Sequence, residues 1–283
     1  MKKILLLTVF LFTACAQQPK LLWTQSEGIK QPESVVYSPA HKAIFVSNIN
    51  GEPLGKDGNG YISMLNLKGR NLASPWMEGL NAPKGLAVSG SHLYVADIDR
   101  LVVINIDKST IEKESPIAGA KFLNDVTAAP NGDIYISDMM DNAVYVLKNE
   151  TIELFLQDPK LEAPNGLHFI NNKLYLASWG IIKEGFSTTK MGHILEIDPS
   201  TKSIIPFGED KELGNLDGLF VVPGQFSLAS DWMHGFIYKI QNKKEAAKIL
   251  DLGQGCADIS YIPEEKILLV PEMGKSDVLA YQL

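Results

Sequence analysis

The stretch EAPNGLHFINNKLYLAS, residues 162–178, decides the fold, because it places two short apolar runs on either side of a tight turn at Asn171-Asn172. An Asn-Gly pair, Asn165-Gly166, stands in front of the first run. Such a pair usually forms a turn, but the turn of this hairpin lies behind it. Asn165 is therefore either a local turn residue or a member of a set that the fold gathers from across the chain.

Similar segments open six apolar runs along the chain. They read PESVVYSP, PKGLAVSG, LNDVTAAP, PNGLHFIN, LDGLFVVP and CADISYIP. The residues in their second places are separated by 51, 40, 41, 52 and 40 residues, and they are Glu33, Lys84, Asn124, Asn165, Asp217 and Ala257. A period of forty to fifty residues is typical of a repeat architecture.

Each repeat continues with a tight turn, a second and a third short strand, and usually a more irregular fourth strand. No segment after the N-terminus shows a helical period. Four antiparallel strands in about forty residues form one blade, so the sequence predicts an all-β, six-bladed β-propeller as a single domain over residues 20–283. The sixth repeat ends after its third strand, and we expect the N-terminal segment KLLWTQSEG, residues 20–28, to add its outer strand and close the ring.

The N-terminus, MKKILLLTVFLFTAC, has two lysines, an apolar run too short to span a bilayer, and then small residues before Cys15. This predicts a lipoprotein signal peptide over residues 1–14, lipidation of Cys15 and a short tether over 15–19; an ordinary secretory peptide is the alternative. By analogy with known lipoproteins, Ala16 favours the outer membrane of a Gram-negative cell, facing the periplasm. With Cys15 acylated, Cys256 has no disulfide partner.

Composition limits the partners. The 283 residues are 45% hydrophobic, which is enough for a large core, and the formal charge is −7. Without a basic patch, the chain is not expected to bind nucleic acid. The expected partner is a small-molecule substrate, contact with the membrane is expected only through the lipid anchor, and a monomer is favoured while the oligomeric state stays open.

The first strand of each propeller blade lines the central channel, so the residues in the second places converge there. The candidate metal ligands are Glu33, Asn124, Asn165 and Asp217, which offer only oxygen donors. The formal charge of −2 on their two carboxylates balances the charge of a divalent cation. Ca²⁺ is the first choice; Mg²⁺ or Mn²⁺ also fit, and Zn²⁺ fits less well because no His or Cys is present. Each residue alone suits a turn, but a shared repeat position favours a site. Lys84 could repel a metal, contact an anionic substrate or lie in solvent, and we expect the last.

With Glu33 on the first blade, the motifs NDV at Asn124, PNGL at Asn165 and LDGL at Asp217 resemble the senescence-marker-protein, gluconolactonase and regucalcin family of metal-dependent hydrolases. The resemblance runs from about residue 20 to residue 283. It implies one catalytic divalent cation on these four residues and hydrolysis of lactones or related esters, with Asp217 as base or nucleophile. Paraoxonases, diisopropyl fluorophosphatases and strictosidine synthases are similar propellers, so the fold alone does not fix the reaction.

One departure from the family concerns the substrate. Phe122 stands where gluconolactonases that act on sugar lactones carry an arginine, which favours a more apolar lactone or ester. The longer repeats place extra residues, 48–60 and 179–192, at the channel mouth, where Trp179 is a candidate wall. Loop residues at the same mouth add Asp138, Asp231 and His234 as pocket candidates.

Two other functions remain open. One is a non-catalytic binding propeller of the cell envelope with a structural Ca²⁺. The other is a strictosidine-synthase-like or organophosphate-hydrolysing enzyme. The sequence has no Gly-x-Ser-x-Gly, phosphate-loop, His-Glu-x-x-His or Cys-x-x-Cys motif, so it gives no support to nucleotide binding or redox chemistry.

Overall fold

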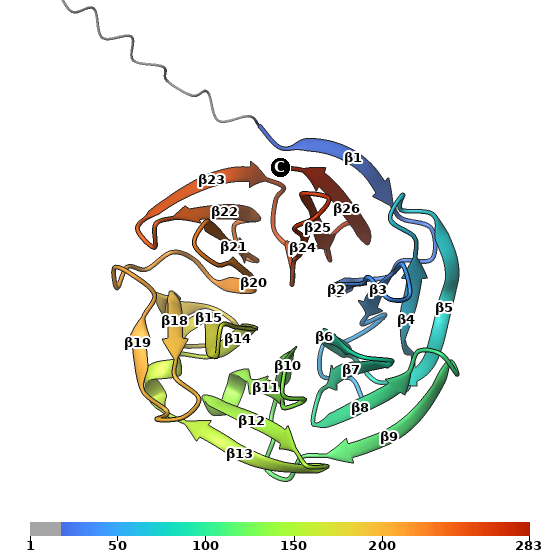
Figure 1. The fold of residues 1–283 in the computed structure, drawn as a ribbon, viewed down its shortest axis with the longest axis horizontal. Coiled ribbons are helices and arrows are strands. Elements are labelled where there is room, and N and C mark those ends of the chain that lie inside the picture. The colour runs from blue at the N-terminus through green and yellow to red at the C-terminus, as the bar shows by residue number, and fades with distance from the viewer. Residues whose placement is uncertain (1–17) are drawn as a thin grey trace, which may run out of the picture.

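The computed structural model describes residues 18–283, which form a ring of six four-stranded antiparallel sheets (Figure 1). This confirms the predicted all-β, six-bladed propeller. The predicted signal peptide and Cys15 lie outside the described residues, so both stay predictions. No helix in the described part of the chain is long and apolar enough to cross a membrane.

Each blade runs from an inner strand at the channel to an outer strand at the rim. Blades one to three contain β2 (Pro32–Ser38), β3 (Ala43–Asn48), β4 (Gly60–Leu65) and β5 (Asn71–Leu80); β6 (Pro83–Ser89), β7 (His92–Asp97), β8 (Arg100–Asn105) and β9 (Thr110–Pro116); and β10 (Leu123–Ala128), β11 (Ile134–Asp138), β12 (Ala143–Lys148) and β13 (Thr151–Gln157). Single 3₁₀ turns, η1 (Met139–Asp141) and η2 (Pro159–Leu161), flank the outer half of blade three.

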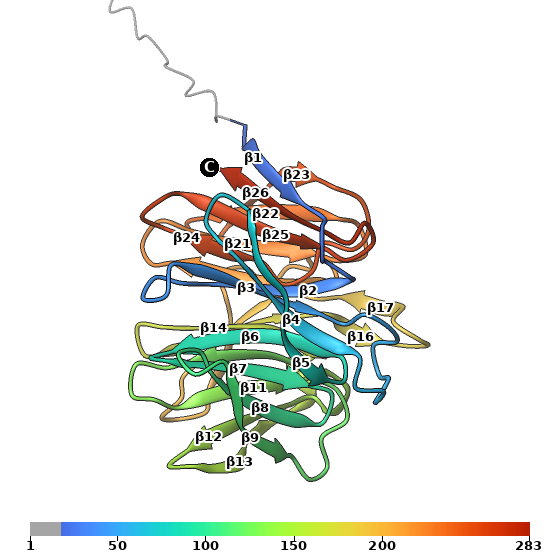
Figure 2. The same cartoon turned by 90° about the vertical axis from the view of Figure 1, so that its right-hand side faces the viewer.

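Blades four to six follow the same order. They contain β14 (Pro164–Ile170), β15 (Lys173–Ser178), β18 (Ile194–Ile197) and β19 (Ile204–Pro206); β20 (Leu216–Val222), β21 (Phe226–Asp231), β22 (Phe236–Gln241) and β23 (Glu245–Asp251); and β24 (Ser260–Ile262), β25 (Ile267–Glu272), β26 (Asp277–Gln282) and β1 (Lys20–Gln25). A separate hairpin, β16 (Gly180–Ile182) with β17 (Thr188–Met191), is inserted in blade four, and Figure 2 shows it projecting beyond the blades.

The N-terminal strand closes the ring as expected, because β1 pairs with β26 as the outer strand of blade six. Trp23 in β1 also ties the sixth blade to the first. Its indole N–H donates to the Leu67 carbonyl at 3.0 Å, and its ring lies so close to Gly69 that a Cβ there would meet it at 2.5 Å.

The core is divided into six apolar layers, one between each pair of neighbouring blades. For example, Phe45 of blade one packs with Val102 of blade two, and Val144 of blade three packs with Leu176 of blade four. The same arrangement recurs at the other four junctions. Burial between blades therefore stabilises the ring and fixes the inner strands around the axis.

Gly166 answers the question that the Asn-Gly pair raises. It lies inside β14, where a Cβ would come within 2.1 Å of the Asp217 carbonyl oxygen. Gly218 is under the same restriction, at 2.2 Å from the Ile259 backbone nitrogen. At the axis the inner strands lie too close together to leave room for a side chain. A glycine therefore follows Asn165 because of tertiary packing, and the Asn-Gly pair forms no turn.

Candidate metal and substrate site

Glu33, Asn124, Asn165 and Asp217 come from four different blades and line one pocket at the channel mouth. All four side chains are buried, with at most 5% of their surface exposed. The walls of the pocket are mainly apolar, and they consist of Ile49, Pro53, Lys84, Phe122, Met139, Trp179, Phe186, Trp232 and Met273.

Each of these four side chains keeps an oxygen without a hydrogen-bond partner. The orphaned atoms are Glu33 Oε2, Asn124 Oδ1, Asn165 Oδ1 and Asp217 Oδ1. In residues 18–283, only three other buried side-chain atoms share this state, and they belong to Asn71, Glu162 and His193, outside the pocket. A buried polar atom without a partner costs about 1–3 kcal/mol, so four in one pocket indicate an electropositive ligand.

A β-bulge aims these side chains at the axis. In blades one to five the pairing of the inner strand shifts register after its first residue, and the second and third residues are skipped. Bulges of this kind redirect side chains and recur beside active sites. The second place of the repeat is therefore special because it lies within the bulge.

Serines of the second strand satisfy the backbone that the bulge releases. Ser137 Oγ accepts from the Asp125 N–H at 2.8 Å and donates to the Asn165 carbonyl of the next blade at 2.8 Å. Ser230 bonds the Gly218 N–H at 2.7 Å and the Ala257 carbonyl at 2.8 Å in the same way. These serines are not among the predicted site residues, although their strands share the pattern Ser-Asp in YISD and LASD.

Three predicted pocket residues lie outside the pocket. The Asp138 carboxylate accepts from the backbone N–H groups of Lys121 and Phe122 at 2.8 and 3.0 Å. Asp231 holds His234 Nδ1 at 2.8 Å, and the His234 side chain is 44% exposed. The aspartates are fully buried because they satisfy backbone and loop donors beside the inner strands.

The prediction that Lys84 lies in solvent is wrong. Only 1% of its surface is exposed, and its Nζ donates to the carbonyls of Pro53 and Ala82 at 2.8 and 2.9 Å. Residues 48–60 fold back over the mouth and bring the Pro53 carbonyl to the lysine, which the sequence does not reveal.

Aromatic rings form the wall opposite the inserted loop of blade one. The ring centroid of Trp179 lies 6.0 Å from those of both Phe186 and Trp232, and Phe122 lies 6.1 Å from Phe186. The Trp179 indole N–H donates to the Phe186 carbonyl at 2.9 Å, which fixes the hairpin tip against the wall. The pocket candidates Phe122 and Trp179 both line this pocket, with Phe186 and Trp232 beside them.

Burial raises the pKa of Glu33 well above its ordinary value, and the charge of Asp217 raises it further. Burial also raises the pKa of Asp217, with a further increase from Asp258. Anionic carboxylates at these positions therefore need a compensating positive charge.

The donor set fits a hard divalent cation. Two carboxylates and two amide carbonyls supply oxygen ligands, and the orphaned atoms face one pocket. Within residues 18–283 no three His, Cys, Asp or Glu side chains are gathered as a metal-binding group. A cation here would thus depend on the two asparagines as well as on Glu33 and Asp217.

Two further carboxylates lie deeper in the channel, in the third place of their repeats. Asp258 accepts from Ser34 Oγ at 2.5 Å, and Asp125 accepts from the Leu167 N–H at 2.6 Å. Both line a depression at the opposite mouth. Burial raises the pKa of Asp258 to about 7, although the Ser34 hydrogen bond lowers it. This pair is not among the predicted site residues, because that prediction rests on the second places of the repeats alone.

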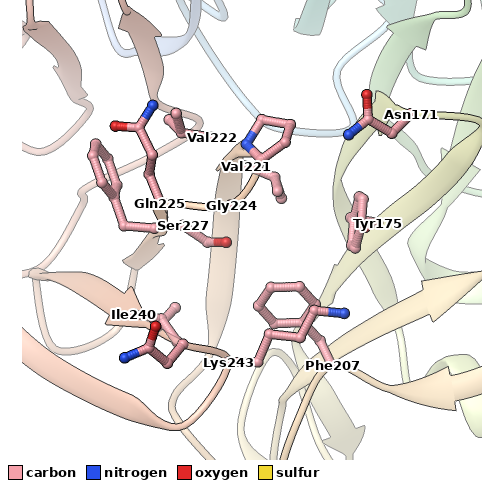
Figure 3. Close-up of a pocket in the computed structure, with 13 residues that line it drawn as sticks. Asn171, Tyr175, Phe207, Val221, Val222, Gly224, Gln225, Ser227, Ile240 and Lys243 are labelled. Carbon is pink, nitrogen blue, oxygen red and sulfur yellow. The ribbon is translucent and has the colours of Figure 1, made fainter.

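Another pocket lies between blades four and five near the turns of the opposite face (Figure 3). Tyr175 and Phe207 form one side of it, and Val221 lies on the other. None of its lining residues is acidic or a histidine. We therefore assign it no chemistry.

Together these features define a six-bladed propeller with an oxygen-lined site at one mouth of its channel. Similar solved structures include a gluconolactonase from Xanthomonas campestris, 15% identical, with a TM-score of 0.68 over 95% of this chain and 96% of that chain. A provisionally assigned gluconolactonase is 18% identical, with a TM-score of 0.67 over 95% of this chain and 92% of that chain.

A chain of a nidogen–laminin complex is also similar, with 16% identity and a TM-score of 0.58 over 75% of this chain and 76% of that chain. At these identities the similarity establishes the shared fold. No protein-family model and no curated protein matches the chain.

Proposed function

We propose that the protein is a divalent-metal-dependent hydrolase of lactones or related esters, with Ca²⁺ as the favoured ion. The four orphaned oxygens of Glu33, Asn124, Asn165 and Asp217 are the observation that carries this proposal. The gluconolactonase propellers of the same fold support it as an analogy.

The role of each residue follows from its place in the pocket. A divalent cation on the four oxygens would supply a Lewis acid for the substrate carbonyl. Asp217 is one of the two carboxylates that line the pocket, and it either accepts the proton of the attacking water or attacks the carbonyl carbon itself. In the first route the water oxygen bonds to the carbonyl carbon, the ester C–O bond breaks and the proton passes to the leaving oxygen. In the second route the ester C–O bond breaks as Asp217 is acylated, and a water molecule then hydrolyses this anhydride, which releases the acid and regenerates the carboxylate. The walls, including Phe122 and Trp179, exclude water and suit an apolar substrate.

The test is a hydrolysis screen over sugar lactones, aliphatic lactones and aryl esters, with Ca²⁺, after chelation and after restoring Ca²⁺. We expect activity on aliphatic lactones or esters that chelation removes and Ca²⁺ restores. Asp217→Asn should lose this activity, whereas Asp251→Asn, at an exposed position on β23, should keep it. Ion binding without turnover of any substrate would favour a binding module instead.

A further inference from the structure

Lys84 is the one cationic side chain among the lining residues of the pocket. Its ammonium has three N–H donors, and in residues 18–283 it uses two of them on the carbonyls of Pro53 and Ala82. The nitrogen also lies 4.7 Å from the centre of the Phe122 ring. One donor is therefore left for a further acceptor at the pocket.

Within residues 18–283 the Lys84 ammonium forms no salt bridge, and Glu33 and Asp97 act on it only through the longer-range attraction of their charges. Its hydrogen-bond partners are neutral, and the nearby carboxylate of Asp97 is bonded to Arg100 at 2.8 Å and to the Ala82 N–H at 2.8 Å. Burial lowers the pKa of Lys84 to about 8, while Glu33 and Asp97 raise it. The carboxylates of Glu33 and Asp97 thus favour the ammonium form of Lys84.

A bound divalent cation changes the charge of the whole pocket. The cation would neutralise the carboxylates of Glu33 and Asp217, and the charge of Lys84 would then be in excess by one. The surrounding wall is mainly apolar, so the excess charge attracts an anion more strongly than it would in solvent.

Building on the proposed hydrolase function, we infer that Lys84 selects substrates that carry a carboxylate close to the hydrolysed ester or lactone bond. The third N–H of Lys84 donates to that carboxylate, and the aromatic wall contacts the hydrocarbon part. The substrate class is thus a small anionic lactone or ester with an otherwise apolar body.

Binding of two probes of equal size tests this inference without turnover. Trp179 and Trp232 line the pocket, so tryptophan fluorescence should report titration of the Ca²⁺-loaded protein with hexanoate and with neutral hexanamide. We expect hexanoate to bind at least about tenfold more tightly, and Lys84→Met to reduce this preference about tenfold. Lys121→Met removes an exposed lysine that pairs with Asp141, and it should leave the preference unchanged.

Lys84→Gln replaces Lys84→Met if the latter does not fold, and the wild-type comparison of the two probes needs no variant. Equal binding of both probes to the wild type would overturn the inference. So would an unchanged preference after loss of the Lys84 charge, since the cation alone would then select the anion.

Hydrolysis separates this inference from the proposed function. Turnover with the same loss on neutral and anionic substrates in Lys84→Met would contradict the role of Lys84 and leave the hydrolase proposal intact. A Lys84-dependent preference for hexanoate without turnover of any ester would support the anion site and contradict the hydrolase proposal.

Discussion

At the residue scale, the four candidate ligands occupy positions that cost stability. Their orphaned oxygens are buried, and burial raises the pKa of both Glu33 and Asp217. Sites that sacrifice stability in this way are typically functional.

Asp217→Asn should therefore have opposite effects on binding and on stability. Replacing a buried carboxylate by an amide of the same shape should raise the free energy of unfolding of the metal-free protein by about 1 kcal/mol. The same change should weaken Ca²⁺ binding about 100-fold or more, since one of two charged ligands is lost. Calorimetric titration and denaturant unfolding check both effects. A variant that binds Ca²⁺ as the wild type does would contradict the assignment.

His168 gives a prediction about pH. Burial lowers its pKa to about 4, and its Nδ1 accepts from the Val221 N–H at 2.7 Å. An unfolded histidine titrates near 6.5, so between about pH 6.5 and 4 the unfolded chain binds more protons and stability falls as the pH falls.

Between pH 7 and 4.5 the wild type should lose about 2 kcal/mol more than His168→Asn, whose amide oxygen can keep the Val221 hydrogen bond. Denaturant unfolding at both pH values measures the difference. Parallel stability profiles for the two proteins would show that His168 is not buried in its neutral form.

At the element scale, the bulge in the inner strands of blades one to five couples the fold to the site. The bulge directs the second-place residue to the axis, and serines of the adjacent strand bind the freed backbone groups. The site thus depends on hydrogen bonds to side chains that lie behind it.

Ser137→Ala tests this coupling. The change leaves the Asp125 N–H and the Asn165 carbonyl without their buried partner, and we expect a loss of about 2 kcal/mol in the free energy of unfolding. Ca²⁺ affinity should fall about tenfold, because Asn165 is less well positioned. Ser203→Ala, at an exposed position, should change neither value. Loss of stability with unchanged Ca²⁺ affinity would show that the bulge does not position the site.

At the scale of the whole molecule, the repeat made most of the fold predictable. Six equivalent segments predict six blades, and the missing outer strand of the last repeat predicts the closure by β1. The shared repeat position of Glu33, Asn124, Asn165 and Asp217 also predicts that they meet. Repetition carries this information because equivalent positions share one geometry.

Features outside the repeat could not be predicted in the same way. The burial of Lys84 depends on the fold-back of residues 48–60, which only one blade has. The predicted pocket residue Asp138 lies on the expected face but turns to the backbone of Lys121 and Phe122. Side-chain direction in single loops follows from local hydrogen bonds that the sequence pattern does not encode.

Closure of the ring can be tested at Trp23. Trp23→Ala removes the packing on Gly69 and the hydrogen bond to Leu67, and it should cost about 2 kcal/mol of unfolding free energy. Leu22→Ala in the same strand is 41% exposed and should cost less than about 0.5 kcal/mol. Thermal and denaturant unfolding give both values. Equal effects of the two changes on the free energy of unfolding would show that Trp23 has no specific role in joining the sixth blade to the first.

The most direct measurement for the central claim is anomalous diffraction from crystals grown with Mn²⁺ in place of Ca²⁺. The account predicts one strong peak at the channel mouth, within about 2.5 Å of oxygens of Glu33, Asn124, Asn165 and Asp217. A map with no peak at these four side chains, from crystals saturated with the ion, would contradict it.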